Sequence, residues 1–253
     1  MYLKHRLKNN DTVYGLFCST PAALSVELIA AAGYDFVIID LEHTLISTGQ
    51  LAAMLLAARA SSITPLVRVA ATYQVLQALD AGAEGIVFPR IGSAQAARAA
   101  VRLCHFAPLG ERGLNATWHS RYGLTDLVAS MQAAQEQTLV VVMIEDLDGL
   151  SRVDEIAAVK GVDILLEGAA DLSQSLGVPW QTRQADVRNA VSRIREAARH
   201  HDKMFCSLPR APDDFAYWYR DEVRIFILGD DRGITRRAMA AHLGQHQIRV
   251  PGQ

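Results

Sequence analysis

The sequence predicts a single (β/α)8 barrel, the TIM-barrel class of α/β fold, over residues 1–253. Eight short runs of apolar and β-branched residues alternate with helical patterns, which is typical of βα units that build a parallel sheet. Most of these runs are continuously apolar, as expected for strands that are covered on both faces. No linker rich in proline, glycine or serine divides the chain. The repeats therefore favour one closed barrel over a doubly wound sheet.

The expected elements follow one another along the whole chain. The strands are, in order, 13–17, 36–40, 65–69, 85–89, 139–145, 162–167, 204–208 and 225–229. The clearest helices, whose apolar residues recur at three and four positions, are 23–32, 49–60, 93–103 and 185–201. Two long connections, 105–126 and 168–186, are expected to leave the C-terminal side of the barrel, where the active sites of this fold lie.

Composition argues against several functions. The net charge of -2 indicates neither a nucleic-acid partner nor an acidic membrane. No apolar window is long enough for a membrane span, and the N-terminal MYLKHRLKNN has no apolar stretch typical of a secretory signal. Cys18, Cys104 and Cys206 are far apart and form no CxxC pair. This spacing predicts reduced thiols, a cytoplasmic location and no zinc site.

Two carboxylates follow neighbouring strands at the expected active face. Glu145 ends the fifth strand and Asp171 follows the sixth, and neither has a lysine beside it. Such a pair predicts an oxygen-ligand site for a divalent ion, Mg²⁺ or Mn²⁺, with Co²⁺ as a further candidate. Helix capping is the alternative for Asp171. Glu167 and Asp146 rank below this pair as ligands.

A histidine and an arginine accompany these carboxylates. His43 follows the second strand, and a pKa near neutrality suits it to act as a general acid or base. We expect Asp40, three residues earlier, to orient the imidazole; a structural role of His43 in its loop is the alternative. Arg68 stands inside an apolar strand, where an unpaired arginine is costly to bury. We expect it to stabilise an enolate oxygen, the alternative being a structural ion pair.

The lysines argue against one mechanism. The chain has four, namely Lys4, Lys8, Lys160 and Lys203, and the last two precede strands six and seven at the opposite end of the barrel. A Schiff-base aldolase needs a lysine at the active face. Metal-assisted formation of an enolate is therefore the mechanism that the sequence favours.

Taken together, six motifs resemble the HpcH/HpaI family of metal-dependent, class II 2-oxo-acid aldolases and citrate lyase-like enzymes. They are AAGYDFVIIDLEH (31–43), VRV (67–69), LDAGAEGIVFP (79–89), PLGERGLN (108–115), VMIE (142–145) and GAADLS (168–173). The resemblance extends from Tyr14 to about Leu243. It implies an enzyme that makes or breaks a carbon–carbon bond in a small 2-oxo acid, and a homo-oligomer, whether dimer, trimer or hexamer.

The resemblance also implies roles for individual residues. Glu145 and Asp171 match the two metal ligands, and Arg68 matches the arginine that holds the keto oxygen and carboxylate of the substrate. His43 matches the catalytic histidine and Asp40 its acidic neighbour.

Other matching positions have supporting roles. Asp80 matches an acid that acts in relatives across a subunit contact. Gly168, Ala169 and Ala170 resemble a turn whose backbone N–H groups receive the substrate carboxylate. Arg112, in the PLGERGLN motif, is a further candidate contact.

Departures from the family pattern point to a larger or more highly charged substrate. Glu167 stands where relatives have a small or proline-containing turn, and is expected beside the metal pair. Arg90 follows the fourth strand where relatives often have an apolar residue, and we expect its side chain to enter the mouth of the barrel. Trp180, in the stretch QSLGVPWQTR (174–183), is a further candidate contact.

These departures favour the siderophore-type citrate synthase branch of the family, with oxaloacetate and acetyl-CoA as substrates. A class II aldolase that cleaves a 4-hydroxy-2-oxo acid to pyruvate and an aldehyde is the alternative. A non-catalytic barrel that binds a metabolite is a third hypothesis, against which the joint presence of Glu145, Asp171, Arg68 and His43 argues.

Overall fold

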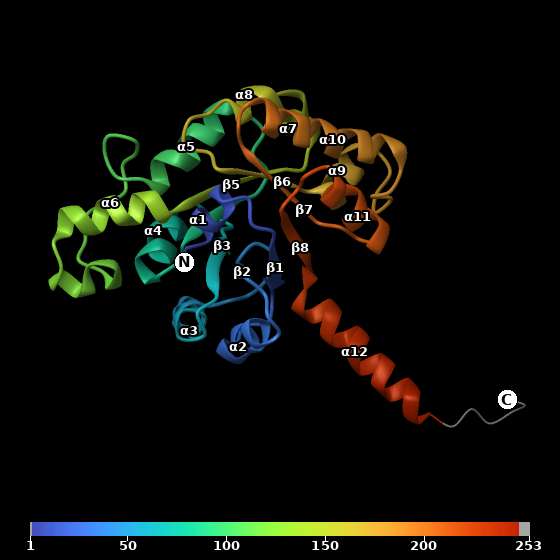
Figure 1. Ribbon diagram of the computed structural model, residues 1–253, viewed down its shortest axis with the longest axis horizontal. Helices are drawn as coiled ribbons and strands as arrows, with labels where there is room; N and C mark the ends of the chain where they lie inside the picture. The colour runs from blue at the N-terminus through green and yellow to red at the C-terminus, as the bar shows by residue number, and fades with distance from the viewer. Residues whose placement is uncertain (1, 248–253) are drawn as a thin grey trace, which may run out of the picture.

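Parallel strands close into a barrel in the computed structural model, which describes residues 2–247 (Figure 1). Each strand pairs with the next along the chain, and the last pairs with the first. The predicted (β/α)8 fold class is thereby confirmed. Met1 and residues 248–253 of the predicted domain lie outside the described residues.

The observed strands coincide with the predicted ones to within one or two residues at each end. They are β1 (Val13–Cys18), β2 (Phe36–Asp40), β3 (Thr64–Arg68), β4 (Gly85–Phe88), β5 (Leu139–Ile144), β6 (Ile164–Glu167), β7 (Met204–Ser207) and β8 (Ile225–Asp230).

Most of the helices surround the barrel. Helix α1 is an exception, because its Leu3 and Leu7 pack into the same apolar cluster as the inward-facing strand residues. The helices are α1 (Leu3–Lys8), α2 (Ala23–Ala31), α3 (Thr48–Ala60), α4 (Tyr73–Ala81), α5 (Ala94–Cys104), the 3-10 helix η1 (Trp118–Gly123), α6 (Leu127–Gln137), α7 (Leu147–Ser151), α8 (Val153–Ala157), α9 (Ala169–Ser175), α10 (Ala185–His200), α11 (Pro212–Arg220) and α12 (Asp231–His246). The four helices that the apolar spacing predicts correspond to α2, α3, α5 and α10.

The alternation of side chains along the strands determines what enters the mouth of the barrel. Phe36 and Ile38 of β2 belong to the apolar cluster inside the barrel, so the next residue on that face is Asp40. By the same alternation, Arg68 and Glu145 continue the inward-facing rows of β3 and β5. Polar groups therefore follow the apolar interior at the C-terminal ends of these strands.

The connection 105–126 lies at the opposite end of the barrel from the predicted one. It follows α5, and a helix of a βα unit ends beside the starts of the strands. Contacts agree with this placement: the His119 ring is hydrogen-bonded to the Leu79 carbonyl at the end of α4, at 3.1 Å. The prediction was wrong because it treated a segment that follows a helix as one that follows a strand. The connection 168–186 does follow a strand, β6.

Helix α12 leaves the barrel and projects away from it (Figure 1, red). Its residues after Asp231 are largely exposed, including Met239 at 67% and Leu243 at 58%. Across residues 2–247, no helix combines the length and the apolar character needed to span a membrane.

Candidate active site

A cavity of about 390 Å³ lies at the C-terminal mouth of the barrel. It brings together several of the predicted residues with others that lie on β1 and β5 or follow β7. The lining residues are Phe17, His43, Arg68, Met143, Gly168, Ala170, Asp171, Gln174, Pro179, Trp180, Leu208 and Arg210. Trp180, itself 82% exposed, lines this cavity from the connection that follows α9.

Arg68 is held by two carboxylates from the end of β2. Its Nε and Nη2 atoms donate to the two Asp40 oxygens at 2.9 and 2.8 Å, and its Nη1 lies 3.2 Å from Glu42 Oε2. The guanidinium also lies over the Phe17 ring, 4.6 Å from its centroid. Asp40 and Arg68 are both buried. The ion pair considered as an alternative exists, and it fixes Arg68 at the wall of the cavity.

The His43 imidazole has a different partner from the one expected. Asp40 receives the backbone N–H groups of Glu42 and His43, at 3.0 and 3.4 Å, while the His43 ring Nε2 lies 3.5 Å from Glu42 Oε2. The prediction that Asp40 orients the imidazole was wrong, because its oxygens are engaged by Arg68 and by the loop backbone. Glu42 is thus a site residue that sequence reasoning missed, although it lies in the DLEH motif.

Glu145 is a buried carboxylate among other acids. It is 3% exposed and accepts the Arg90 backbone N–H at 2.7 Å. Burial, with the nearby Glu42 and Asp171 carboxylates, raises the pKa of Glu145 to about 7, although the Arg90 N–H and Arg68 act in the opposite direction. A carboxylate in these surroundings favours a bound cation.

The donor set fits a divalent metal that takes oxygen ligands. Glu145 and Asp171 supply carboxylates, and Asp171 makes no capping hydrogen bond in α9, whose N-cap is Gly168. Throughout residues 2–247, no group of three or more His, Cys, Asp or Glu side chains could hold a metal. Two protein carboxylates are enough for Mg²⁺, which usually keeps several waters and binds substrate oxygens.

Gly168 allows the backbone to approach Glu145 closely. A Cβ atom built on Gly168 would lie 2.3 Å from Glu145 Cβ and 2.8 Å from its Oε2. Its N–H donates to the Ile144 carbonyl at 3.0 Å, so the first turn of α9 begins directly beside Glu145. Gly168 and Ala170 line the cavity, while Ala169 is buried and does not line it.

Arg90 contributes its backbone to the site. Its side chain is 66% exposed, with Nε 3.9 Å from Glu42 Oε1, and it is absent from the cavity wall. Arg90 has a φ of 53°, in the left-handed region. The expectation that its side chain lines the mouth beside Arg68 therefore does not match the structure.

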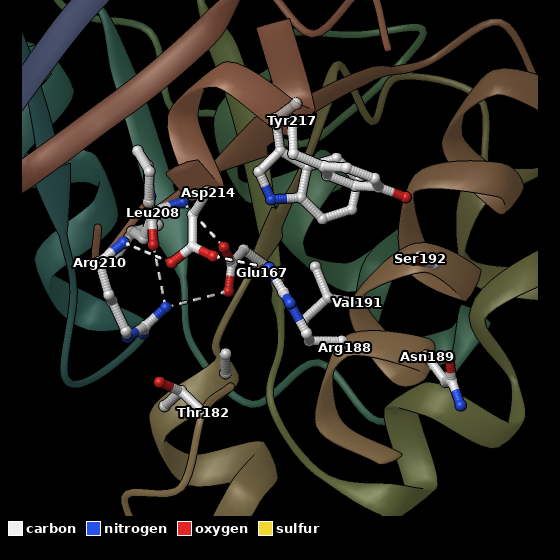
Figure 2. A pocket seen from close by; sticks show the side chains of 13 residues that line it. Glu167, Thr182, Arg188, Asn189, Val191, Ser192, Leu208, Arg210, Asp214 and Tyr217 are labelled. Carbon is white, nitrogen blue, oxygen red and sulfur yellow. Dashed lines mark hydrogen bonds and ion pairs between the residues drawn. The ribbon is translucent and has the colours of Figure 1, made fainter. Parts of the chain in front are cut away.

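Glu167 faces β7 instead of the metal pair. Its Oε1 accepts the Ser207 hydroxyl at 3.2 Å. The same Oε1 accepts the Leu208 N–H at 2.9 Å, and Oε2 lies 3.5 Å from Arg210 Nη1 (Figure 2). The expectation was wrong because Glu167 belongs to the outward-facing row of β6, which alternates with the inward-facing Leu166. Arg210 is a second site residue that sequence reasoning missed.

Asp80 and Arg112 lie away from this cavity within one chain. They form an ion pair of 2.9 Å where α4 ends beside the 105–126 connection. Arg112 also lies over the Phe106 ring, 4.8 Å from its centroid. A role of Asp80 across a subunit contact stays a prediction.

The fold and the site define a (β/α)8 barrel with buried carboxylates and a buried arginine at its C-terminal mouth. The model of the HpcH/HpaI aldolase/citrate lyase family matches residues 13–236, and the chain belongs to this family. The resemblance inferred from the motifs is confirmed. Family membership makes the protein an enzyme of the carbon–carbon lyase and synthase class, which sets aside the hypothesis of a non-catalytic barrel.

The similar proteins include both aldolases and a citrate synthase. The 4-hydroxy-4-methyl-2-oxoglutarate aldolase cghB of Chaetomium globosum is 41% identical over 71% of this chain and 69% of its own. A hydroxypyruvate/pyruvate aldolase of Paraburkholderia phytofirmans is 40% identical over 78% of each chain. The solved structure of citrate synthase SbnG is 45% identical, with a TM-score of 0.90 over 96% of each chain.

Proposed function

We propose that the protein makes or breaks a carbon–carbon bond in a small 2-oxo acid, through an enolate and with a divalent metal, Mg²⁺ or Mn²⁺. One observation carries the proposal. The Asp171 carboxylate and the Arg68 guanidinium line one cavity at the mouth of the barrel, and the carboxylate of the buried Glu145 lies near both of them. The lysines that a Schiff-base mechanism would need lie elsewhere: Lys4, for example, pairs with Asp163, just before β6.

The residues of the chain have distinct tasks in this proposal. Glu145 and Asp171 would hold the metal, which when bound supplies positive charge that stabilises the negative charge developing on the keto oxygen of the 2-oxo acid. Arg68 presents N–H groups to the keto oxygen and carboxylate, and its two acidic partners keep the guanidinium in place. Ala169 and Ala170 offer backbone N–H groups at the start of α9 to the substrate carboxylate. His43 moves the proton, with Glu42 beside its ring.

Within this chemistry we propose citrate synthesis from oxaloacetate and acetyl-CoA. Its support is the likeness to citrate synthase SbnG, which is 45% identical over 96% of the chain. In this reaction His43 would take a methyl proton from the thioester, and the resulting carbanion would attack the keto carbon of oxaloacetate. Hydrolysis of the thioester would then release coenzyme A.

Aldol cleavage of a 4-hydroxy-2-oxo acid is the second candidate. Relatives named as 4-hydroxy-4-methyl-2-oxoglutarate and hydroxypyruvate/pyruvate aldolases share 40% to 41% identity with more than two thirds of the chain. In this reaction pyruvate itself forms the enolate, and the proton transfers of His43 involve the 4-hydroxyl group and the pyruvate methyl group.

We also propose that the protein forms a homo-oligomer and resides in the cytoplasm. Support for an oligomer comes from α12, which projects with Met239 and Leu243 exposed, and from α2, which exposes Leu24 and Leu28. Apolar side chains gathered on such faces favour burial against another surface. The cytoplasmic location is supported by the cysteines, which are buried free thiols.

Product analysis tests the proposed function. The metal-loaded enzyme is incubated with oxaloacetate and acetyl-CoA, and separately with pyruvate and aldehydes, and products are identified by mass spectrometry. Exchange of pyruvate methyl protons for deuterium reports enolate formation directly. Citrate with free coenzyme A supports the synthase, and aldol products alone support the aldolase. If neither products nor deuterium exchange appear, the proposal fails.

A further inference from the structure

Arg210 is a cation of the cavity wall that retains unused hydrogen-bond donors. It follows β7 and lines the cavity together with Arg68 and Asp171. Its Nη1 donates to the Leu208 carbonyl at 2.9 Å and lies 3.5 Å from Glu167 Oε2. Among residues 2–247, its Nε and Nη2 atoms have no hydrogen-bond or ion-pair partner.

Glu167 holds this guanidinium in place. The carboxylate is 3% exposed and is fixed by the Ser207 hydroxyl and the Leu208 N–H, both at the end of β7. It therefore offers Arg210 a rigid anchor on one side. Because an arginine has five N–H donors in a planar fork, anchoring at Nη1 leaves the remaining donors for a ligand.

The other arginines near the mouth are differently engaged. Arg68 donates two hydrogen bonds to Asp40, and its third nitrogen, Nη1, lies 3.2 Å from Glu42 Oε2. Arg90 lies outside the cavity wall, with its side chain mostly in solvent. Together with the metal, Arg68 accounts for the carboxylate and keto oxygen that all 2-oxo acids share. Arg210 is thus available for a further negative charge.

We propose that Arg210, positioned by Glu167, binds a second carboxylate of the substrate and makes the site selective for a dicarboxylic 2-oxo acid over pyruvate. The inference rests on the proposed function and names the substrate class of the same site. Planar recognition of a carboxylate by two parallel N–H donors is the geometry that arginine favours. Glu167 acts through Arg210 and is a positioning residue.

Steady-state kinetics with two substrates tests the assignment. Arg210→Met is assayed for oxaloacetate consumption and for deuterium exchange of the pyruvate methyl group, with thermal melting as the check of folding. We expect kcat/KM for oxaloacetate to fall by about 30-fold or more, because a carboxylate in a partly desolvated site loses its charged partner. The rate of pyruvate exchange should fall far less.

Further variants separate charge from geometry. Arg210→Lys keeps the charge without the planar fork and should recover part of the loss. Glu167→Gln should raise KM for oxaloacetate with little change in kcat, since it releases Arg210 without touching the reacting atoms. Arg183→Met is the matched control, because Arg183 is an exposed arginine on the 168–186 connection and pairs with Asp213. It should leave both substrates unaffected.

Three outcomes would overturn the inference. Equal losses of oxaloacetate and pyruvate activity in Arg210→Met would make Arg210 a general structural residue. Undiminished activity of Arg210→Met with both oxaloacetate and pyruvate would show that Arg210 contacts neither substrate. A selective loss in Arg90→Met alone would transfer the role to Arg90. Absence of citrate, of aldol products and of pyruvate exchange alike in the unmodified, metal-loaded enzyme would instead refute the proposed function itself, so the two failures are distinguishable.

Discussion

Arg68→Lys separates the catalytic role of Arg68 from its structural one. In the structure the guanidinium uses three nitrogens at once, two on Asp40 and one near Glu42. A lysine carries the same charge on a single nitrogen and cannot reproduce this fork. The variant therefore keeps a cation beside Asp40, but it loses the rigid presentation of N–H groups towards the cavity.

The two roles predict losses of different size. Removing one donor to a developing oxyanion costs about 100-fold to 1000-fold in kcat. The free energy of unfolding of Arg68→Lys should fall less than that of Arg68→Met, because Asp40 keeps a charged neighbour and two backbone N–H donors, at 3.0 and 3.4 Å. Arg68→Met would leave the buried Asp40 charge unpaired, at a cost of about 3–5 kcal/mol in the free energy of unfolding.

The assay compares saturating turnover with the free energy of unfolding measured in urea. Arg195→Lys is the matched control: Arg195 is 9% exposed, against 8% for Arg68, and its Nε pairs with Asp221 at 2.8 Å, away from the cavity. It should lose stability as Arg68→Lys does and keep full turnover. Near-normal turnover of Arg68→Lys would refute the reasoning and leave Arg68 a structural ion-pair partner.

Three other predictions concern the metal, the response to pH and the assembly. EDTA should abolish activity, and Mg²⁺ or Mn²⁺ should restore it. Glu145→Gln should weaken the binding of Mn²⁺, measured by calorimetry, by at least about tenfold. Full activity after chelation, or substrate trapped on a lysine by borohydride, would contradict the metal site. Burial lowers the pKa of His105 from 6.5 to about 4, so the unfolded chain binds a proton that the folded protein excludes between these pH values. The resulting stability is complete above pH 6.5 and is lost as the pH falls towards 4, by up to about 3 kcal/mol, and His105→Asn should flatten this decline in urea titrations. Replacing both Met239 and Leu243 with Glu should reduce the mass measured by light scattering without lowering helix content; an unchanged mass would exclude α12 from the interface.

Local pattern was sufficient to predict the fold. A strand buried on both faces is a short apolar run whatever its partners are, so the eight runs indicated β1 to β8 directly. The alternation along a strand then places Asp40, Arg68 and Glu145 on the inner face, since each continues a row of apolar residues. These positions follow from the sequence because they depend on the residue's own strand alone.

Pairing between side chains from different elements was not predictable in the same way. Whether Asp40 contacts the His43 ring or the Arg68 guanidinium depends on the register of β2 against β3, where Asp40 stands opposite Arg68. Glu42 has no inward-facing strand position, and only its three neighbours, Arg68, His43 and Arg90, reveal its place in the site. The prediction paired the His43 ring with Asp40, whereas the ring lies beside Glu42.

The two Pro–Arg pairs show that a position just after a strand does not by itself predict where an arginine side chain lies. Arg90 follows β4 and Arg210 follows β7, each directly after a proline, so the same reasoning nominates both for the mouth of the barrel. Arg90 adopts a left-handed φ of 53° and its side chain lies mostly in solvent, whereas Arg210 is held at the cavity by Glu167. That anchor could have been anticipated, because Glu167 alternates with the inward-facing Leu166 and stands in line with Ser207 of the neighbouring strand. Glu167, which departs from the family pattern, thus faces β7 and contacts Arg210, and this contact is why we propose Arg210, and not Arg90, as the arginine that faces the substrate.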